Sequence, residues 1–214
     1  METETSLEKE LWFMSRLPYS PKNVSLIRTQ SGDKAREVRS KAKWEALGYR
    51  VLDDAEPFVI VCPSGKDFKK VKVYDVRDTS KARSKPPKRI NICKELEEII
   101  SNLGYKLLYS DDDREMKISK SSKTLWVNKD CNKTFVLCKA IGMLHSSALP
   151  LVKATAIGTA TAFIVSWRFG NEIKSLNEKA KAAILQDKKD CLNNSYRIAN
   201  KLTEAIVTIK KRHR

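Results

Sequence analysis

The apolar residues of this chain are concentrated in one stretch, from Cys131 to Asn171, which contains no Asp or Glu. In its first part, apolar residues recur at three- and four-residue intervals, which is the spacing of one helix face. Its second part, Val152 to Trp167, is apolar on nearly all sides, as is typical of a buried helix. We expect these two helices to form the core on which the other elements pack.

Shorter apolar patterns predict helices and strands on both sides of this core. The expected helices are residues 1–17, 23–30, 34–47 and 92–103, with one or two more from 171 to the end, and the expected strands are 49–52, 58–62, 71–76, 106–109, 115–119 and 124–127. Short strands joined by tight turns favour small antiparallel sheets with flanking helices. The predicted fold class is therefore α+β, in two domains, with long C-terminal helices.

The segment 80–91 predicts the domain boundary. It carries five Lys or Arg, two prolines and no acid, which is typical of an exposed linker. We therefore expect a first domain over 1–79, a basic linker over 80–91 and a second domain over 92–214.

The charge indicates a polyanionic partner. The net charge is +16 over 214 residues, and the excess of Lys and Arg lies in the segments 16–52, 80–94 and 131–214. Nucleic acid is the first interpretation of such a charge, and an anionic membrane surface is the second. A basic surface kept only for solubility is the alternative.

Other sequence features suggest a cytoplasmic protein without a membrane partner. The five cysteines form no Cys-x-x-Cys pair, as expected of reduced thiols. No apolar segment of a secretory signal is present near Met1. The longest apolar segment, Ala148 to Trp167, is interrupted by Lys153, which leaves fewer than the roughly 20 residues that a membrane-spanning helix needs.

An ordered set of short motifs runs from Tyr19 to Thr79. The motifs are Tyr19-Ser20, Asn23, Leu26-Ile27 and Gln30, then Lys43-Trp44, Leu47-Gly48 and Val51, then Pro57, Ile60 and Pro63, and finally Val73-Tyr74-Asp75-Val76 with Asp78-Thr79. This set resembles the N-terminal domain of ArdC-type antirestriction proteins, which belong to conjugative plasmids, phages and their relatives. The segment Leu52 to Glu56 departs from that family, because it is acidic where the family has a basic loop.

The resemblance implies that the first domain binds single-stranded DNA. The residue types agree with this, because Lys and Arg neutralise phosphates and exposed aromatic rings stack on bases. The candidate nucleic-acid-binding residues are Asn23, Arg28, Gln30, Arg36, Arg39, Lys41, Lys43, Trp44, Tyr49, Arg50, Tyr74, Lys85, Lys88 and Arg89. We expect residues 36, 39 and 43 to share one helix face, whereas Trp44 is equally well explained as a core anchor of its helix.

The second half resembles the zinc peptidase domain of the ImmA/IrrE type, which follows the DNA-binding domain in that family. The order of elements agrees, from the helix at Ile92 to Arg168-Phe169-Gly170, but the HExxH motif is absent. One alignment places its two histidines at Leu137 and Ile141 and its glutamate at Cys138. The other makes His145 the second histidine and places Ile141 and Gly142 at the first histidine and the glutamate. The third ligand falls near Thr155 to Thr159.

The residue types also argue against a catalytic metal, whatever the alignment. A hydrolytic zinc site needs three nitrogen or oxygen ligands and a base that deprotonates the bound water. The chain has two histidines, His145 and His213, and no carboxylate between Asp130 and Glu172. We therefore expect an inactive metallopeptidase scaffold that has no metal, no cofactor and no catalytic residues.

Two functional hypotheses follow. The first is a non-catalytic antirestriction or anti-defence protein of a plasmid or phage that binds single-stranded DNA, or RNA, through its basic patches. The alternative is an inhibitor or adaptor that binds a host defence nuclease or a ribonucleoprotein complex, in the manner of an anti-CRISPR protein, and that uses the inactive peptidase scaffold as its interaction surface.

Overall fold

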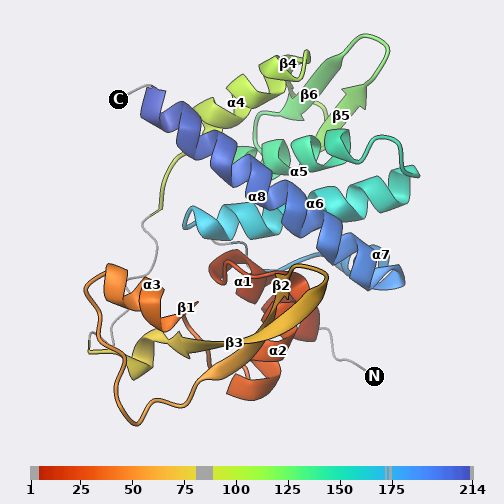
Figure 1. Cartoon of the computed structure of the whole chain (residues 1–214). Coiled ribbons are helices and arrows are strands. Elements are labelled where there is room, and N and C mark those ends of the chain that lie inside the picture. Colours follow the sequence, from red (N-terminus) through yellow and green to blue (C-terminus); the bar gives the residue numbers. More distant parts are fainter. Residues whose placement is uncertain (1–4, 81–88, 172, 174, 213–214) are drawn as a thin grey trace. The chain divides into compact units, whose positions relative to one another are not determined.

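The computed structural model describes residues 5–80, 89–171, 173 and 175–212. It contains helices and two small three-stranded sheets, and this confirms the predicted α+β class (Figure 1). The chain divides into two compact units. The small unit is Arg16–Pro86, and the large unit combines Met1–Ser15 with Pro87–Arg214.

The small unit is built around a long β-hairpin. Its elements are α2 (Pro21–Ser31), β1 (Val38–Arg39), α3 (Lys41–Ala46), β2 (Phe58–Ser64), β3 (Asp67–Asp75) and the 3-10 helix η1 (Val76–Asp78). The sheet has the order β1-β3-β2, and both pairings are antiparallel. The turn between β2 and β3 contains Gly65 at φ 63°, a backbone conformation that a glycine adopts without steric cost.

A buried carboxylate holds the end of the sheet. Asp75 is fully buried, and its two side-chain oxygens accept hydrogen bonds from the backbone N–H groups of Arg36 and Arg77. The Arg77 guanidinium also pairs with it at 2.8 Å. A buried carboxylate is stable only when it is paired and hydrogen-bonded in this way, so Asp75 fixes the chain before β1 to the end of β3.

Two predictions for the small unit are wrong. Residues 34–47 do not form one helix, because Val38 pairs with Asp75 as a strand and α3 begins only after Ser40. The Ser40 hydroxyl accepts a hydrogen bond from the backbone N–H of Lys43, as expected of a helix N-cap. The strand predicted at 49–52 is reduced to an isolated bridge between Val51 and Thr79.

The large unit contains the remaining elements. These are α1 (Thr5–Arg16, which ends at the unit boundary), α4 (Cys93–Asn102), β4 (Lys106–Ser110), β5 (Met116–Ser119), β6 (Thr124–Asn128), α5 (Lys133–His145), α6 (Leu151–Arg168), α7 (Glu178–Gln186) and α8 (Lys188–Arg212). The predicted core helices are α5 and α6, and α8 lies across α6 (Figure 1). In one detail the sheet differs from the prediction. It is mixed rather than antiparallel, because β6 pairs antiparallel with β5 and parallel with β4.

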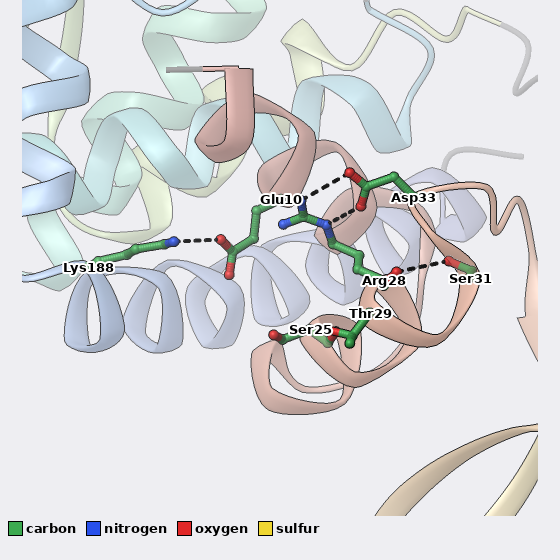
Figure 2. Close-up of polar contacts among 7 residues, drawn as sticks. All are labelled: Glu10, Ser25, Arg28, Thr29, Ser31, Asp33 and Lys188. Carbon is green, nitrogen blue, oxygen red and sulfur yellow. Dashed lines mark hydrogen bonds and ion pairs between the residues drawn. The ribbon is translucent and has the colours of Figure 1, made fainter. Parts of the chain in front are cut away.

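Residues 1–15 group with the large unit, whereas the sequence placed them in the first domain. The buried guanidinium of Arg168 donates hydrogen bonds to the carbonyl oxygens of Met14 and Ser15, at the C-terminal end of α1. A second contact is the ion pair between Lys188 and Glu10 at 3.1 Å (Figure 2). A cation at a helix C-terminus satisfies carbonyl groups that have no partner within the helix, so α1 is held to α6 and α8 by these polar contacts.

The helices α5 and α6 cross with their backbones in direct contact. A Cβ atom added to Gly158 would lie 2.6 Å from the carbonyl oxygen of Lys139, and one added to Gly142 would lie 2.8 Å from the Cα atom of Gly158. Both distances are too short for any side chain. Glycine is therefore required on both helices at this crossing.

No described helix has the length and apolarity that spanning a lipid bilayer requires.

We predict that Gly158→Ala destabilises the protein by about 1–3 kcal/mol, because the added methyl group must push two backbones apart. Urea unfolding followed by circular dichroism measures this change. The control is Asn193→Ala on the exposed side of α8, which we expect to change the free energy of unfolding by less than about 0.5 kcal/mol. Equal stability of Gly158→Ala and the wild type would contradict the described crossing.

Candidate nucleic-acid interface

One face of the β2–β3 hairpin brings together basic and aromatic side chains. Residues opposite one another in an antiparallel pair, and every second residue along a strand, point to the same side of the sheet. The register places Lys70 opposite Val61, Lys72 opposite Val59 and Tyr74 opposite Arg39. The basic and aromatic residues of this face are Arg39, Phe68, Lys70, Lys72 and Tyr74, and we call these five the hairpin face.

Along Phe68, Lys70 and Lys72 the hairpin face points outward because the other side of the sheet forms the core, whereas Tyr74 packs against the buried cluster of Trp44, Val51 and Val76. Ile60 and Val73, on the core side, are each 1% exposed. On the hairpin face, by contrast, Lys70 and Lys72 are exposed and Phe68 is 71% exposed. An exposed phenylalanine between lysines is not explained by packing within the small unit.

The charge of the hairpin face is largely unneutralised. No ion pair within the described part of the chain involves Lys70 or Lys72. Arg39 pairs with Glu37 at 2.7 Å, and its guanidinium carbon also lies 5.5 Å from the centre of the Trp44 ring. Since Lys22 adds an ammonium group 5.9 Å from the Phe68 ring, the face combines cations with an open aromatic ring.

Several of the predicted basic residues are exposed, but they do not share the expected helix face. Lys41 and Lys43 lie on α3, whereas Arg36 precedes β1 and Arg39 belongs to it. The prediction that 36, 39 and 43 share one helix face is therefore wrong, because the helix starts after Ser40. Arg50 is also exposed, and its backbone N–H donates to the hydroxyl of Ser80.

Trp44 is a core residue of the small unit. Its side chain is 1% exposed, and its indole N–H donates to the carbonyl oxygen of Tyr74 at 2.9 Å. Tyr49 packs against it with ring centroids 5.1 Å apart, and Val51 and Val76 complete the cluster. A buried indole has no face open for base stacking, so the core alternative describes Trp44. The rings of Tyr49 and Tyr74 remain partly exposed.

Asn23 and Gln30 bond to the backbone of β2. The Asn23 side-chain amide donates to the carbonyl oxygen of Val61 and accepts from its N–H, and Gln30 does the same for Val59. In the order β1-β3-β2, β2 is an edge strand whose outer N–H and C=O groups lack a strand partner. The two amides of α2 supply that partner, and this role leaves them outside the hairpin face.

The remaining predicted residues lie elsewhere. Arg28 pairs with Asp33 at 2.8 Å (Figure 2). Arg89 belongs to the large unit, where it and Lys133 line a polar cavity of about 830 Å³. Lys85 and Lys88 lie outside the described residues. The sequence analysis overlooked Phe68, Lys70 and Lys72, although their alternation along the sequence is the signal of a strand with one polar face.

The large unit does not offer a metal site at the positions that the peptidase pattern indicates. Leu137, Cys138 and Ile141 are fully buried in α5, and burial raises the pKa of the Cys138 thiol, which disfavours the thiolate that binds metals. Gly142 is in contact with α6. No group of three His, Cys, Asp or Glu residues within the described residues is arranged to hold a metal ion. At these positions the described side chains therefore do not fit a catalytic metal.

His145, which the second alignment places at the second histidine, lies at the exposed C-terminal end of α5, one turn after Ile141. Burial of its ring lowers its pKa, and the charges of Lys201 and Arg197 lower the pKa further. Two neighbouring cations disfavour a bound cation in the same way as they disfavour the imidazolium. His145 is therefore a poor metal ligand in this setting.

The fold and the site define a two-unit α+β protein with a basic, aromatic sheet face and a core helix pair that lacks metal ligands in its described part. Two crystal structures of the antirestriction ArdC protein from the R388 plasmid share this fold. The Mn(II)-bound structure has a TM-score of 0.59 at 11% identity, with 93% of this chain and 91% of that chain covered. The metal-free structure has a TM-score of 0.57 at 11% identity, with 94% and 91% covered.

This chain therefore has an ArdC-like fold over nearly its whole length, which confirms the resemblance at the level of the fold. No protein-family model matches the sequence, and no curated protein matches it.

We predict that Asn23→Ala destabilises the small unit by about 1–3 kcal/mol, because it leaves both backbone groups of Val61 without their partner. Denaturant unfolding measures the loss. Ser25→Ala, on the exposed side of the same helix, is the control and should be close to neutral. Equal effects of the two substitutions would show that the hydrogen bonds from the Asn23 amide to the backbone of Val61 do not stabilise the edge of β2.

Proposed function

We propose that this protein is a non-catalytic antirestriction protein that binds single-stranded nucleic acid, DNA in preference to RNA, through the hairpin face. The observation that carries the proposal is the outward alternation on β3 of Phe68, Lys70, Lys72 and Tyr74, in which aromatic rings flank two lysines without an ion-pair partner among the described residues. Lysines attract the phosphates, and rings that are open to solvent offer a surface for bases.

Single strands suit this face better than duplexes. Stacking of one base on an aromatic ring contributes about 1–3 kcal/mol, and it requires a base that is free to leave its own stack. A duplex presents only phosphates to such a surface and would use the lysines alone. The 71% exposure of Phe68 is therefore a reason to expect unpaired bases.

Two further observations support the antirestriction role and the absence of catalysis. The fold is shared with a protein that is named for antirestriction. The helix pair of the large unit presents buried apolar residues and glycine where a peptidase of this type needs histidines and a glutamate. On this proposal the large unit is an inactive scaffold, and protection of the nucleic acid comes from binding it.

An apolar groove in the large unit favours the alternative function, an inhibitor or adaptor that binds a host defence nuclease or ribonucleoprotein complex. The groove has a volume of about 790 Å³ and runs between α5, α6 and α7. Leu151 and Val152 on its rim are 74% and 62% exposed, and exposed apolar patches of this kind often mark protein contacts. Partners recovered from host lysate after nuclease treatment would favour the adaptor, whereas partners lost on that treatment would favour nucleic-acid binding.

We predict that Lys70→Gln and Lys72→Gln each weaken binding of a fluorescent single-stranded DNA and reduce the slope of log K against log salt by about 0.7. Lys69→Gln is the matched control, because Lys69 is exposed on the same strand but points to the other side of the sheet. Phe68→Ala should weaken binding by about 1–3 kcal/mol without changing the slope, because it removes stacking and no charge.

Fluorescence anisotropy with single-stranded DNA, duplex DNA and RNA in parallel gives all of these values. Absence of binding at low salt would refute nucleic-acid binding altogether. An equal effect of Lys69→Gln and Lys70→Gln would refute the hairpin face as the site.

A further inference from the structure

The helix α8 has a buried side whose bordering cations are neutralised. Its buried residues are Cys191, Leu192, Ser195, Ile198, Ala199, Leu202, Ile206 and Ile209. Lys188 lies at the N-terminal end of this side and Lys210 at its C-terminal end. Lys188 pairs with Glu10 at 3.1 Å (Figure 2), and Lys210 pairs with Glu95 at 3.0 Å. Both lysines therefore help to hold α8 in the large unit.

The opposite side of α8 carries a second set of cations. At about 100° per residue, Lys189, Arg197, Lys201 and Lys211 fall within about 120° of arc, and their span along the axis is about 33 Å. All four side chains are exposed. We call these four residues the α8 stripe.

The α8 stripe is poorly neutralised in the described part of the chain. None of its residues takes part in an ion pair there, and the polar contact of Arg197 is with the neutral side chain of Asn194. Two described acids fall within the same arc: Asp190, which pairs with Lys153 at 2.6 Å, and Glu204. Arg197 and Lys201 are four residues apart, and like charges at this spacing repel one another.

The surroundings of the stripe point to a phosphate backbone as its partner. His145 of α5 lies close enough to Lys201 and Arg197 for their positive charges to lower its pKa, so the ring beside these two cations is neutral near pH 7. A membrane is a poorer match, because a helix that lies on a bilayer needs a broad apolar side for insertion. On this side of α8 the one exposed large apolar residue among those described is Val207, at 41%.

We propose that the α8 stripe is a second binding track for the phosphate backbone of nucleic acid, separate in the chain from the hairpin face. This inference rests on the proposed function and extends it, since it gives the large unit a direct part in binding. On the α8 stripe, unlike the hairpin face, described aromatic rings do not alternate with the cations. The track therefore contacts phosphates and not bases, and its binding does not depend on the nucleotide sequence.

The test uses the full-length protein and the triple variant Arg197→Gln/Lys201→Gln/Lys211→Gln. Glutamine keeps a high helix propensity, and thermal melting checks that the variant is folded. The control is Lys106→Gln/Lys117→Gln/Lys123→Gln, which removes the same charge from three exposed lysines of the β4–β6 region. Anisotropy titrations over a salt series use one single-stranded DNA of about 30 nucleotides, with Lys70→Gln as the variant of the hairpin face.

The track predicts that the triple variant of α8 binds at least tenfold more weakly near 0.1 M salt and that its salt slope falls by about 2, at about 0.7 per lost phosphate contact. The control triple should keep the slope of the wild type. Lys201→Gln alone should lower the salt slope by about one third of that amount. This single variant is a second test if the triple variant has a reduced melting temperature.

Three results would overturn the track. The first is an unchanged slope in the α8 variant together with weakened binding of Lys70→Gln, which would leave the proposed function intact. The second is an equal loss in both triple variants, which would show an effect of net charge alone. The third is a triple variant of α8 that binds single-stranded DNA as the wild type does but binds vesicles containing phosphatidylserine more weakly than the wild type. If the wild type binds no nucleic acid at low salt, the proposed function fails along with the track.

Discussion

The close approach of α5 and α6 is the constraint on which the large unit depends. Glycines at 142 and 158 let the two backbones touch, and the surrounding residues of α5 are fully buried apolar side chains. Such a contact gains its stability from dispersion and from the exclusion of water, and at the crossing itself it leaves no room for a side chain between the two backbones. The positions on α5 at which the peptidase pattern would place its ligands are therefore occupied by core packing.

In the small unit, core packing and hydrogen bonds occupy most of the surfaces of the β2–β3 hairpin. One side of the β2–β3 hairpin is core, and the amides of Asn23 and Gln30 occupy the open edge of β2. Trp44 and its neighbours fill the space near β1 and the end of β3. The outward side of the hairpin is then the surface that these contacts leave to solvent, and it is the surface that carries lysines and an exposed ring.

The sequence predicted well the elements that depend on local periodicity. The helix at 92–103, the strands at 106–109, 115–119 and 124–127, and the two core helices all appear within a few residues of their expected positions. The predicted helix at 34–47 failed because the strand at Val38 is created by a distant partner, Asp75, which local propensity does not contain. The Ser40 cap was a local signal that would have placed the start of α3 correctly.

The candidate site was predictable in its chemistry and less so in its residues. The excess of Lys and Arg in 16–52 indicated a polyanion partner, but side chains of the same type were indistinguishable until the register showed which of them face outward. Asn23, Gln30 and Trp44 look like binding residues in the sequence, and tertiary contacts give them structural roles. Lys70 and Lys72 were open to prediction from the alternation along β3, because a strand with one buried side must present its other residues to solvent.

The most direct test of the account is the metal content of the purified protein after equilibration with Mn(II) or Zn(II) and removal of free ion by gel filtration. Because the described positions on α5 carry buried apolar residues and glycine where the peptidase pattern has its ligands, the proposed function predicts that mass spectrometry of the eluted protein finds far less than one ion per chain. It also predicts that a chelator leaves nucleic-acid binding unaffected. One tightly held ion per chain, lost together with binding when the chelator is added, would contradict the central claim that this protein acts by binding through a scaffold without a metal.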